Sequence, residues 1–188
     1  MKNKKIILAS GSPRRVELLK MLGWKFHIIP SRIEEKINPS LSPIENVKKL
    51  SLQKALDVSS RVSVGVVIAA DTIVVSNRKV LGKPKNRKIA LEMLKKLSGK
   101  EHQVITGLAV VDVKTKKVLQ KAVITKVKFQ KLNKDLIEKY IASGESLDKA
   151  GAYGIQGGGA LLIESIKGDY FNVVGLPLNA LNNLLEKL

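Results

Sequence analysis

The stretch 6–15 limits most strongly what this chain can fold into. It begins with an apolar run typical of a buried strand, continues through Ser10-Gly11-Ser12, and then meets Pro13. Serine followed by proline is favoured at a helix start. Serine can cap the first N–H groups of the helix, and proline has no N–H of its own that would need a partner there. The pattern predicts a strand, a tight loop and a helix that stops at Gly23, where glycine suits a left-handed conformation.

The charge of this helix start is unusual for its position. Arg14 and Arg15 would lie in the first turn, where the helix dipole disfavours each cation by roughly 0.3–1 kcal/mol. Free backbone N–H groups, a loop of small residues and two guanidinium groups together suit a bound phosphate. The alternative is a solvated helix start whose arginines point outward.

Composition favours a single domain over residues 1–188. Hydrophobic residues make up 44% of the chain, enough to bury a core, and the absence of Cys excludes disulfides and thiolate metal sites, so any metal would be held by oxygen. The apolar run behind the basic N-terminus is too short for a signal peptide, and the longest apolar stretch, 62–75, is too short for a membrane helix. We expect a cytoplasmic protein in which 62–75 forms a buried strand pair.

The chain is strongly basic. Lys and Arg number 34 against 16 Asp and Glu, a net charge of +18 that raises nucleic acid as a partner. The excess is mostly lysine spread along the sequence, and aromatic residues that could stack on bases make up only 4%. A charged surface typical of the source organism explains the same composition, so both interpretations stay open.

Hydrophobic periodicity predicts an α/β fold. Helices and strands alternate, but several strands are joined by short turns, so we expect a mixed β-sheet flanked by helices. Ser42-Pro43 with Glu45 forms a capping box that should start a helix. The expected inner stripe of this helix is Ile44, Val47, Ser51, Ala55 and Val58. The other expected elements are strands at 24–28, 80–81, 103–113, 118–129 and 160–163 and helices at 90–97, 135–143 and 178–188.

Asp71 is the residue that most strongly indicates chemistry. It interrupts an apolar run, where an ionised carboxylate without a partner is costly to bury. One interpretation is an aspartate that caps a neighbouring loop at the end of a strand. The other is a carboxylate that binds a hard cation and orients or deprotonates a water molecule.

Several other charged residues are weaker candidates taken singly. Glu34 and Glu35 offer oxygen ligands in a loop, although adjacent loop glutamates are usually solvated. Lys54 would flank the inner stripe of its helix and could present its ammonium at the edge of a cleft. Lys83 is held between glycine and proline. Both lysines are otherwise ordinary surface residues.

The glycine-rich segment 148–159 allows a backbone to approach a ligand closely. Within it, Gln156 offers an amide that can both donate to and accept from the edge of a base. A plain flexible loop is the competing interpretation. His27 and His102 lie far apart in the sequence and suggest no zinc site, so we expect both to be structural.

Together these segments resemble the Maf family of nucleoside triphosphate pyrophosphatases over essentially the whole chain. The segments that carry the resemblance are 8–15, 33–35, 54–55, 70–74, 82–84, 97–99, 148–157 and 173–178. Several motifs in the right order are far more specific than any single one. The resemblance implies two lobes around a cleft, in a fold similar to that of the inosine triphosphate pyrophosphatases.

The resemblance implies hydrolysis of a nucleoside triphosphate between its α- and β-phosphates, which releases the monophosphate and pyrophosphate and requires Mg²⁺ or Mn²⁺. Asp71 would be the general base and would hold the metal together with Glu35 and Glu34. The residues that would hold the triphosphate are Ser10, Arg15, Lys54 and Lys83. Because charge builds on phosphate oxygens in the transition state, cations and positioned donors should supply most of the rate.

The resemblance also implies a substrate class. Family members similar to dTTP/UTP pyrophosphatases carry arginine, threonine and glutamine at the positions of Arg14, Thr72 and Gln156. The branch that prefers 7-methyl-GTP has a bulky residue before the arginine, glutamine after the aspartate and glutamate in the glycine-rich loop. The implied substrates are therefore dTTP and UTP, with modified pyrimidine nucleotides as further candidates. A glutamine amide suits the edge of uracil or thymine, whereas a glutamate would prefer the donors of guanine.

Two rival functions remain. The first is a basic nucleotide- or RNA-binding protein without turnover that acts in division control, for which the net charge is the best support. Against it, carboxylates beside phosphate-holding cations would repel the ligand unless a metal intervenes. The second is an inosine triphosphate pyrophosphatase that removes deaminated purines, which Arg14, Thr72 and Gln156 argue against. The family resemblance also makes a homodimer an expectation, without a membrane partner.

Overall fold

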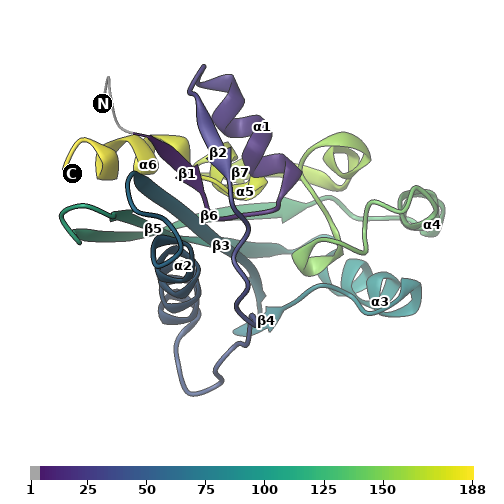
Figure 1. The fold of residues 1–188 in the computed structure, drawn as a ribbon. Coiled ribbons are helices and arrows are strands. Elements are labelled where there is room, and N and C mark those ends of the chain that lie inside the picture. The colour runs from purple at the N-terminus through teal and green to yellow at the C-terminus, as the bar shows by residue number, and fades with distance from the viewer. Residues whose placement is uncertain (1–4) are drawn as a thin grey trace. The chain divides into compact units, whose positions relative to one another are not determined.

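The computed structural model describes residues 5–188, which form a mixed seven-stranded sheet flanked by helices (Figure 1). The strand order is β2-β1-β3-β5-β6-β7, and β4 pairs with β3. The strands are β1 (Ile6–Leu8), β2 (Phe26–Ile28), β3 (Val66–Ser76), β4 (Lys79–Leu81), β5 (Glu101–Asp112), β6 (Val118–Phe129) and β7 (Ile163–Lys167). The helices are α1 (Pro13–Met21), α2 (Pro43–Ser59), α3 (Arg87–Leu97), α4 (Lys134–Ala142), α5 (Tyr170–Val174) and α6 (Leu178–Leu185), with 3₁₀ helices η1 (Ala150–Ala152) and η2 (Gly157–Leu162). The predicted α/β class with a mixed sheet is confirmed.

The chain divides into two compact units, and the long strands β3, β5 and β6 contribute residues to both. The first unit comprises the chain up to Asp71 with Thr106–Val123 and Gly175–Leu188. In it, β1 pairs in parallel with β2 on one side and with β3 on the other. A buried apolar cluster forms its core between the sheet and α2: Ile7, Ala9, Ala55, Val58, Val67, Ala69, Ala109, Val111 and Val113.

The second unit comprises Thr72–Ile105 and Ile124–Val174. Here β4 pairs with β3 and β7 pairs with β6, both antiparallel, while α3 and α4 lie side by side (Figure 1). Its core is a second apolar cluster, whose members include Leu94, Leu97, Phe129, Tyr140, Tyr153 and Leu162. This unit contains the glycine-rich segment.

The predicted capping box starts α2 as expected. Ser42 Oγ accepts from the backbone N–H of Glu45 at 3.2 Å, and Glu45 Oε2 accepts from the backbone N–H of Ser42 at 2.7 Å. Most of the predicted stripe is buried, but Ile44 is 40% exposed, because the stripe begins one turn later at Val47. Lys54 belongs to the buried face of α2 and is only 6% exposed.

Two predicted strands differ from the structure. Segment 62–75 is not a strand pair: one continuous strand, β3, begins at Val66, after Gly65 with φ of 127°. The predicted strand at 160–163 is wrong, since Gly157–Leu162 forms the 3₁₀ helix η2 and β7 begins at Ile163. Three consecutive glycines lack side chains that would favour an extended strand, so the chain turns there before it pairs with β6.

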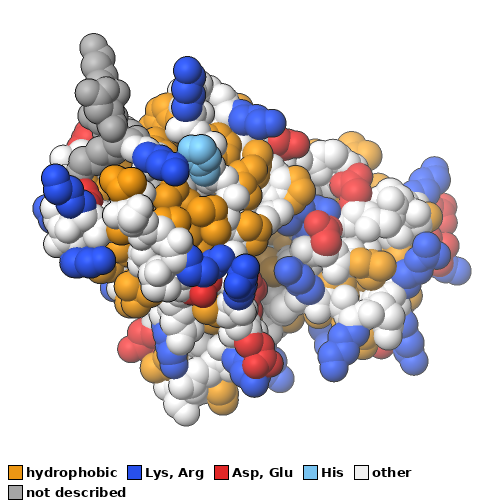
Figure 2. Space-filling model, in the orientation of Figure 1, with side chains coloured by type: hydrophobic (Ala, Val, Ile, Leu, Met, Phe, Trp, Pro, Cys, Tyr) orange, Lys and Arg blue, Asp and Glu red, His pale blue; other side chains and the backbone are white. Residues whose placement is uncertain are grey.

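The surface charge is dispersed. Figure 2 shows lysine and arginine side chains scattered over the visible face, with acidic side chains among them. Several exposed lysines pair with glutamates, for example Lys128 with Glu164 at 2.7 Å and Lys126 with Glu101 at 3.0 Å. Among the described residues, no helix combines the length and the apolar character that crossing a membrane requires.

Candidate active site

The loop between β1 and α1 holds Ser10 and Arg15 against each other. Ser10 is buried, and its Oγ accepts hydrogen bonds from Arg15 Nη1 and from the backbone N–H of Ser12, each at 3.2 Å. Arg15 Nε donates to the carbonyl oxygen of Gly175 at 2.8 Å. These contacts fix a guanidinium in the first turn of α1, which contains no acidic residue. Ser12 occupies the predicted N-cap position, but its side chain makes no capping hydrogen bond.

One lysine joins two carboxylates in the same unit. Lys54 Nζ lies 2.7 Å from Asp71 Oδ1 and 2.7 Å from Glu35 Oε1. Lys54 and Asp71 are both buried, whereas the side chain of Glu35 is 52% exposed. The three groups come from α2, β3 and the loop between β2 and α2. Asp71 therefore pairs with a buried ammonium, which answers the question of what compensates its burial.

A close backbone contact sets the position of α2 on the sheet. A Cβ atom at Gly107 in β5 would lie 2.3 Å from the carbonyl oxygen of Val47 and 2.9 Å from the amide nitrogen of Lys48. Only glycine lets the strand and the helix approach this closely. The contact lies two helical turns from Lys54 on the same helix. It therefore helps to determine the position along β3 at which the ammonium of Lys54 meets Asp71.

The electrostatics link Arg15 to the same carboxylates. Burial lowers the pKa of Arg15 below its usual value, and the negative charges of Asp71 and Glu35 oppose this effect. The neighbouring charge of Arg14 also lowers the pKa of Arg15, although a guanidinium stays protonated at neutral pH. Arg15, Lys54, Asp71 and Glu35 thus form one interacting group of two cations and two anions.

Glu34 is placed differently from its neighbour. Its carboxylate pairs with Lys36 at 2.8 Å, and both side chains are about three-quarters exposed, 74% and 75%. The structure therefore brings Glu35, and not Glu34, to Lys54 and Asp71.

Three further predicted residues, Thr72, Lys83 and Gln156, belong to the second unit. Thr72 follows Asp71 on β3 and is half-buried; because side chains alternate along a strand, it faces away from Asp71. Lys83 is exposed, and the carbonyl oxygen of the preceding Gly82 accepts from the backbone N–H of Gly151 at 3.0 Å. This bond ties the Lys83 segment to the glycine-rich segment that carries the half-buried Gln156.

Comparison with known proteins connects this arrangement to a family. The sequence profile described as Maf-like protein matches residues 5–188. The chain belongs to the Maf family. The relatives of this Maf protein include curated proteins named dTTP/UTP pyrophosphatase. The one from Ruminiclostridium cellulolyticum is 51% identical over 98% of this chain and 96% of its own length.

Two further relatives carry the same name. The Alkaliphilus oremlandii protein is 54% identical, covering 97% of this chain and 95% of its own, and the Dictyoglomus thermophilum protein is 49% identical, covering 98% and 96%. Among solved structures, a nucleoside-triphosphatase / dITP/XTP pyrophosphatase from Mycobacterium abscessus aligns with a TM-score of 0.48 and 11% identity, over 97% of this chain and 93% of its own. The family assignment of the Maf protein rests on the sequence matches alone.

The donor set of this Maf protein fits a hard divalent cation. Asp71 and Glu35 supply carboxylate oxygens from separate elements, and both already converge on a single cationic group, the ammonium of Lys54. Mg²⁺ is usually bound by one or two carboxylates together with waters and substrate phosphates. Among residues 5–188 no group of three or more His, Asp or Glu side chains gathers, so a complete protein cage is not the arrangement this site offers.

Sequence reasoning missed how the glycine-rich segment is supported. His102 was expected to be structural, and it is 3% exposed, but its Nε2 lies 2.6 Å from the hydroxyl of Tyr153. Tyr140 accepts from the backbone N–H of Gly154 at 3.1 Å. The signal in the sequence was a tyrosine inside a run of small residues, where a large buried ring is unusual for a flexible loop.

Proposed function

We propose that this Maf protein is a nucleoside triphosphate pyrophosphatase that hydrolyses dTTP and UTP to the monophosphate and pyrophosphate. The observation that carries the proposal is the ammonium of Lys54, held by Asp71 and Glu35 beside the Ser10–Arg15 pair. A buried ion pair is weak support for stability, so these charges are better explained by chemistry. The full-length relatives named dTTP/UTP pyrophosphatase support the same reaction.

Two cations of the first unit, Arg15 and Lys54, are assigned to phosphate binding. The guanidinium of Arg15 and the ammonium of Lys54 neutralise the charge that develops on phosphate oxygens during cleavage. Ser10 and the carbonyl of Gly175 hold the Arg15 fork in place, so little of its freedom is lost when the ligand arrives. Lys83, which belongs to the second unit, stays a triphosphate ligand predicted from the family resemblance.

Asp71 is the residue we assign as general base. Its Oδ1 accepts from Lys54, and its carboxylate accepts the proton of the attacking water. The water then attacks the α-phosphorus, and pyrophosphate leaves. Asp71 and Glu35 would also hold Mg²⁺ or Mn²⁺, which when bound supplies Lewis-acid stabilisation of the phosphate oxygens.

Recognition of the base is assigned to the second unit. Gln156 carries an amide that can donate to a carbonyl oxygen and accept from an N–H, the pair of groups that uracil and thymine present together. The side chain of Gln156 makes no capping hydrogen bond at the start of η2, so its amide is not used for that purpose. Arg14 and Thr72 are the other positions that support pyrimidine selection.

The test is release of pyrophosphate by the purified protein with Mg²⁺ or Mn²⁺, across dTTP, UTP, CTP, GTP, ATP, ITP and 7-methyl-GTP. We expect dTTP and UTP to be turned over fastest and Asp71→Asn to remove the activity. No release from any nucleotide, or full activity in Asp71→Asn, would overturn the proposal. Preferred hydrolysis of ITP would keep the reaction but replace the substrate class.

Adjacent glutamates provide a matched control for the metal assignment. Glu35→Gln removes a carboxylate that contacts Lys54, whereas Glu34→Gln changes the neighbouring exposed carboxylate that pairs with Lys36. We expect the first variant to need much more Mg²⁺ for half-maximal rate and the second to behave like the parent. An equal effect of both would place Glu34 in the metal set as well.

A further inference from the structure

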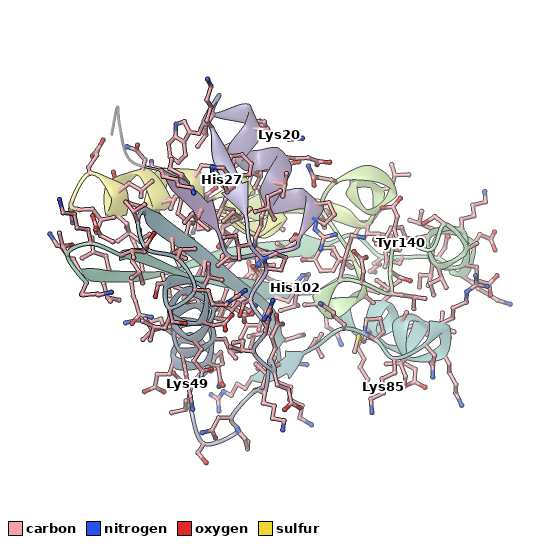
Figure 3. All side chains as sticks on the ribbon, viewed as in Figure 1. Lys20, His27, Lys49, Lys85, His102 and Tyr140 are labelled. Carbon is pink, nitrogen blue, oxygen red and sulfur yellow. The ribbon has the colours of Figure 1, made fainter. Side chains whose placement is uncertain are left out.

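Two buried tyrosines hold the glycine-rich segment of the second unit, one from within the segment and one from a neighbouring helix. Tyr153 lies within the segment, is 5% exposed, and places its hydroxyl 2.6 Å from His102 Nε2 on β5. Tyr140 comes from α4, is 4% exposed, and its hydroxyl accepts from the backbone N–H of Gly154 at 3.1 Å. His102 and Tyr140 are labelled in Figure 3. One anchor is thus a side chain of the segment and the other grips its backbone.

The rings of the first anchor pack in a fixed arrangement. Phe129 of β6 lies edge-on to Tyr153 and to His102, with ring centroids 4.7 and 5.0 Å apart, and His102 and Tyr153 are 5.3 Å apart. Edge-to-face contacts of this kind favour one ring orientation over others. This packing favours the ring orientation in which the hydroxyl of Tyr153 reaches His102.

The protonation states of His102 and Tyr153 determine which group donates the hydrogen bond and which accepts it. Burial lowers the pKa of His102 to about 4, so the imidazole is neutral near pH 7 and Nε2 can accept. Burial also raises the pKa of Tyr153, so its hydroxyl keeps the proton and donates. The bond then runs from Tyr153 Oη to His102 Nε2.

The backbone on either side of the two anchored residues, Tyr153 and Gly154, has little room for another path. Gly151 and Ala152 both have positive φ, 71° and 64°, and a Cβ atom at Gly159 would lie 1.9 Å from the carbonyl oxygen of Gly154. Gly158 also donates its N–H to Glu145 Oε1 at 3.3 Å. Gln156 lies between these fixed points, so its backbone position is determined by them.

We propose that Tyr153, with His102 as its acceptor, and Tyr140 are positioning residues for Gln156 and thereby determine how well the protein distinguishes uracil and thymine from other bases. This inference rests on the proposed function. None of the three residues is assigned a contact with substrate. They act by holding the segment, and with it the backbone of Gln156, in a fixed position within the second unit.

The test uses the three tyrosines of the chain as a matched set. Tyr153→Phe and Tyr140→Phe each remove one hydroxyl and keep the ring, while Tyr170→Phe does the same at an exposed position outside the segment. The measurement is the ratio of kcat/KM for UTP to that for CTP, with Gln156→Ala as the reference for lost recognition. We expect Tyr153→Phe to lower this ratio about five- to tenfold, the loss typical of one hydrogen bond, and Tyr170→Phe to leave it unchanged.

A double variant separates positioning from general loss of structure. In the Gln156→Ala background, Tyr153→Phe should not lower the ratio further, because the residue that it positions is already gone. His102→Gln, which can still accept from the hydroxyl, should retain most of the selectivity, whereas His102→Leu should lose it. A merely structural role would lower the rates for UTP and CTP equally and leave the ratio unchanged.

The outcomes distinguish this inference from the function on which it rests. If the parent protein hydrolyses dTTP and UTP but Tyr153→Phe keeps the full ratio, the positioning role is refuted and the function stands. If the parent protein releases no pyrophosphate from either nucleotide, the function and the inference both fall.

Discussion

The buried His102 should make the stability of this protein fall steeply in mild acid. Burial lowers the pKa of this imidazole from 6.5 to about 4, against the opposing effects of the charge of Glu101 and a backbone hydrogen bond with Lys100. Between these two pH values the unfolded chain binds a proton at this histidine and the folded chain does not. The free energy of unfolding therefore decreases as the pH falls through this window, and is fully retained above about pH 7.

The size of the effect follows from the difference between the two pKa values. The shift of about 2.5 pH units corresponds to about 3 kcal/mol once the pH reaches 4, at 1.36 kcal/mol for each unit. For a chain of this length that is equivalent to roughly 5–10 °C in Tm. Protonation of carboxylates also lowers the stability of the protein in acid. The effect of His102 must therefore be obtained as the difference between the parent and a variant without this histidine.

The assay is urea unfolding at a series of pH values from 7.5 to 4.5 for the parent protein and for His102→Gln. The glutamine keeps an acceptor for Tyr153 but cannot titrate, and all carboxylates are common to both proteins. We expect the parent to lose about 2–3 kcal/mol more than the variant over this range. Parallel pH profiles for the two proteins would refute the burial argument, whatever their absolute stabilities.

Three more outcomes follow from contacts in the first unit. Gly107→Ala places a methyl group 2.3 Å from the carbonyl oxygen of Val47. It should therefore lower the free energy of unfolding in urea by about 3 kcal/mol and also lower the hydrolysis rate. A variant as stable and as active as the parent would contradict this. Lys54→Met leaves the buried carboxylate of Asp71 without its cation. This variant should lower the free energy of unfolding by about 3–5 kcal/mol and abolish pyrophosphate release. Ser42→Ala removes half of the capping box and should cost about 1 kcal/mol with unchanged kcat, so a large loss of activity there would be unexpected.

Local signals in the sequence predicted much of the first unit. Ser12-Pro13 and the capping box at Ser42 marked two helix starts correctly, since caps depend on a few neighbouring residues. The glycine at position 23 has the left-handed φ expected of it, 68°. The charge pattern also selected Asp71 and Lys54, which the structure brings to 2.7 Å.

Features that depend on distant partners were not predictable in this way. Glu34 and Glu35 look alike in the sequence, and only the fold separates the one that meets Lys54 from the one that meets Lys36. The bond between Tyr153 and His102 joins residues 51 positions apart, and no local pattern announces it. The strand expected at 160–163 is wrong because the apolar residues 160–162 belong to the 3₁₀ helix η2 that begins in the run of glycines, and pairing with β6 begins only at Ile163.

The contact of β5 with α2 at Gly107 is made by main-chain atoms. Its geometry therefore depends on glycine at position 107 as well as on the apolar side chains that pack α2 on the sheet. Lys54 belongs to that helix, so the close approach at Gly107 also affects the distance between the ammonium of Lys54 and Asp71. A side chain at position 107 would therefore alter the spacing of charged groups that lie far from it in the sequence.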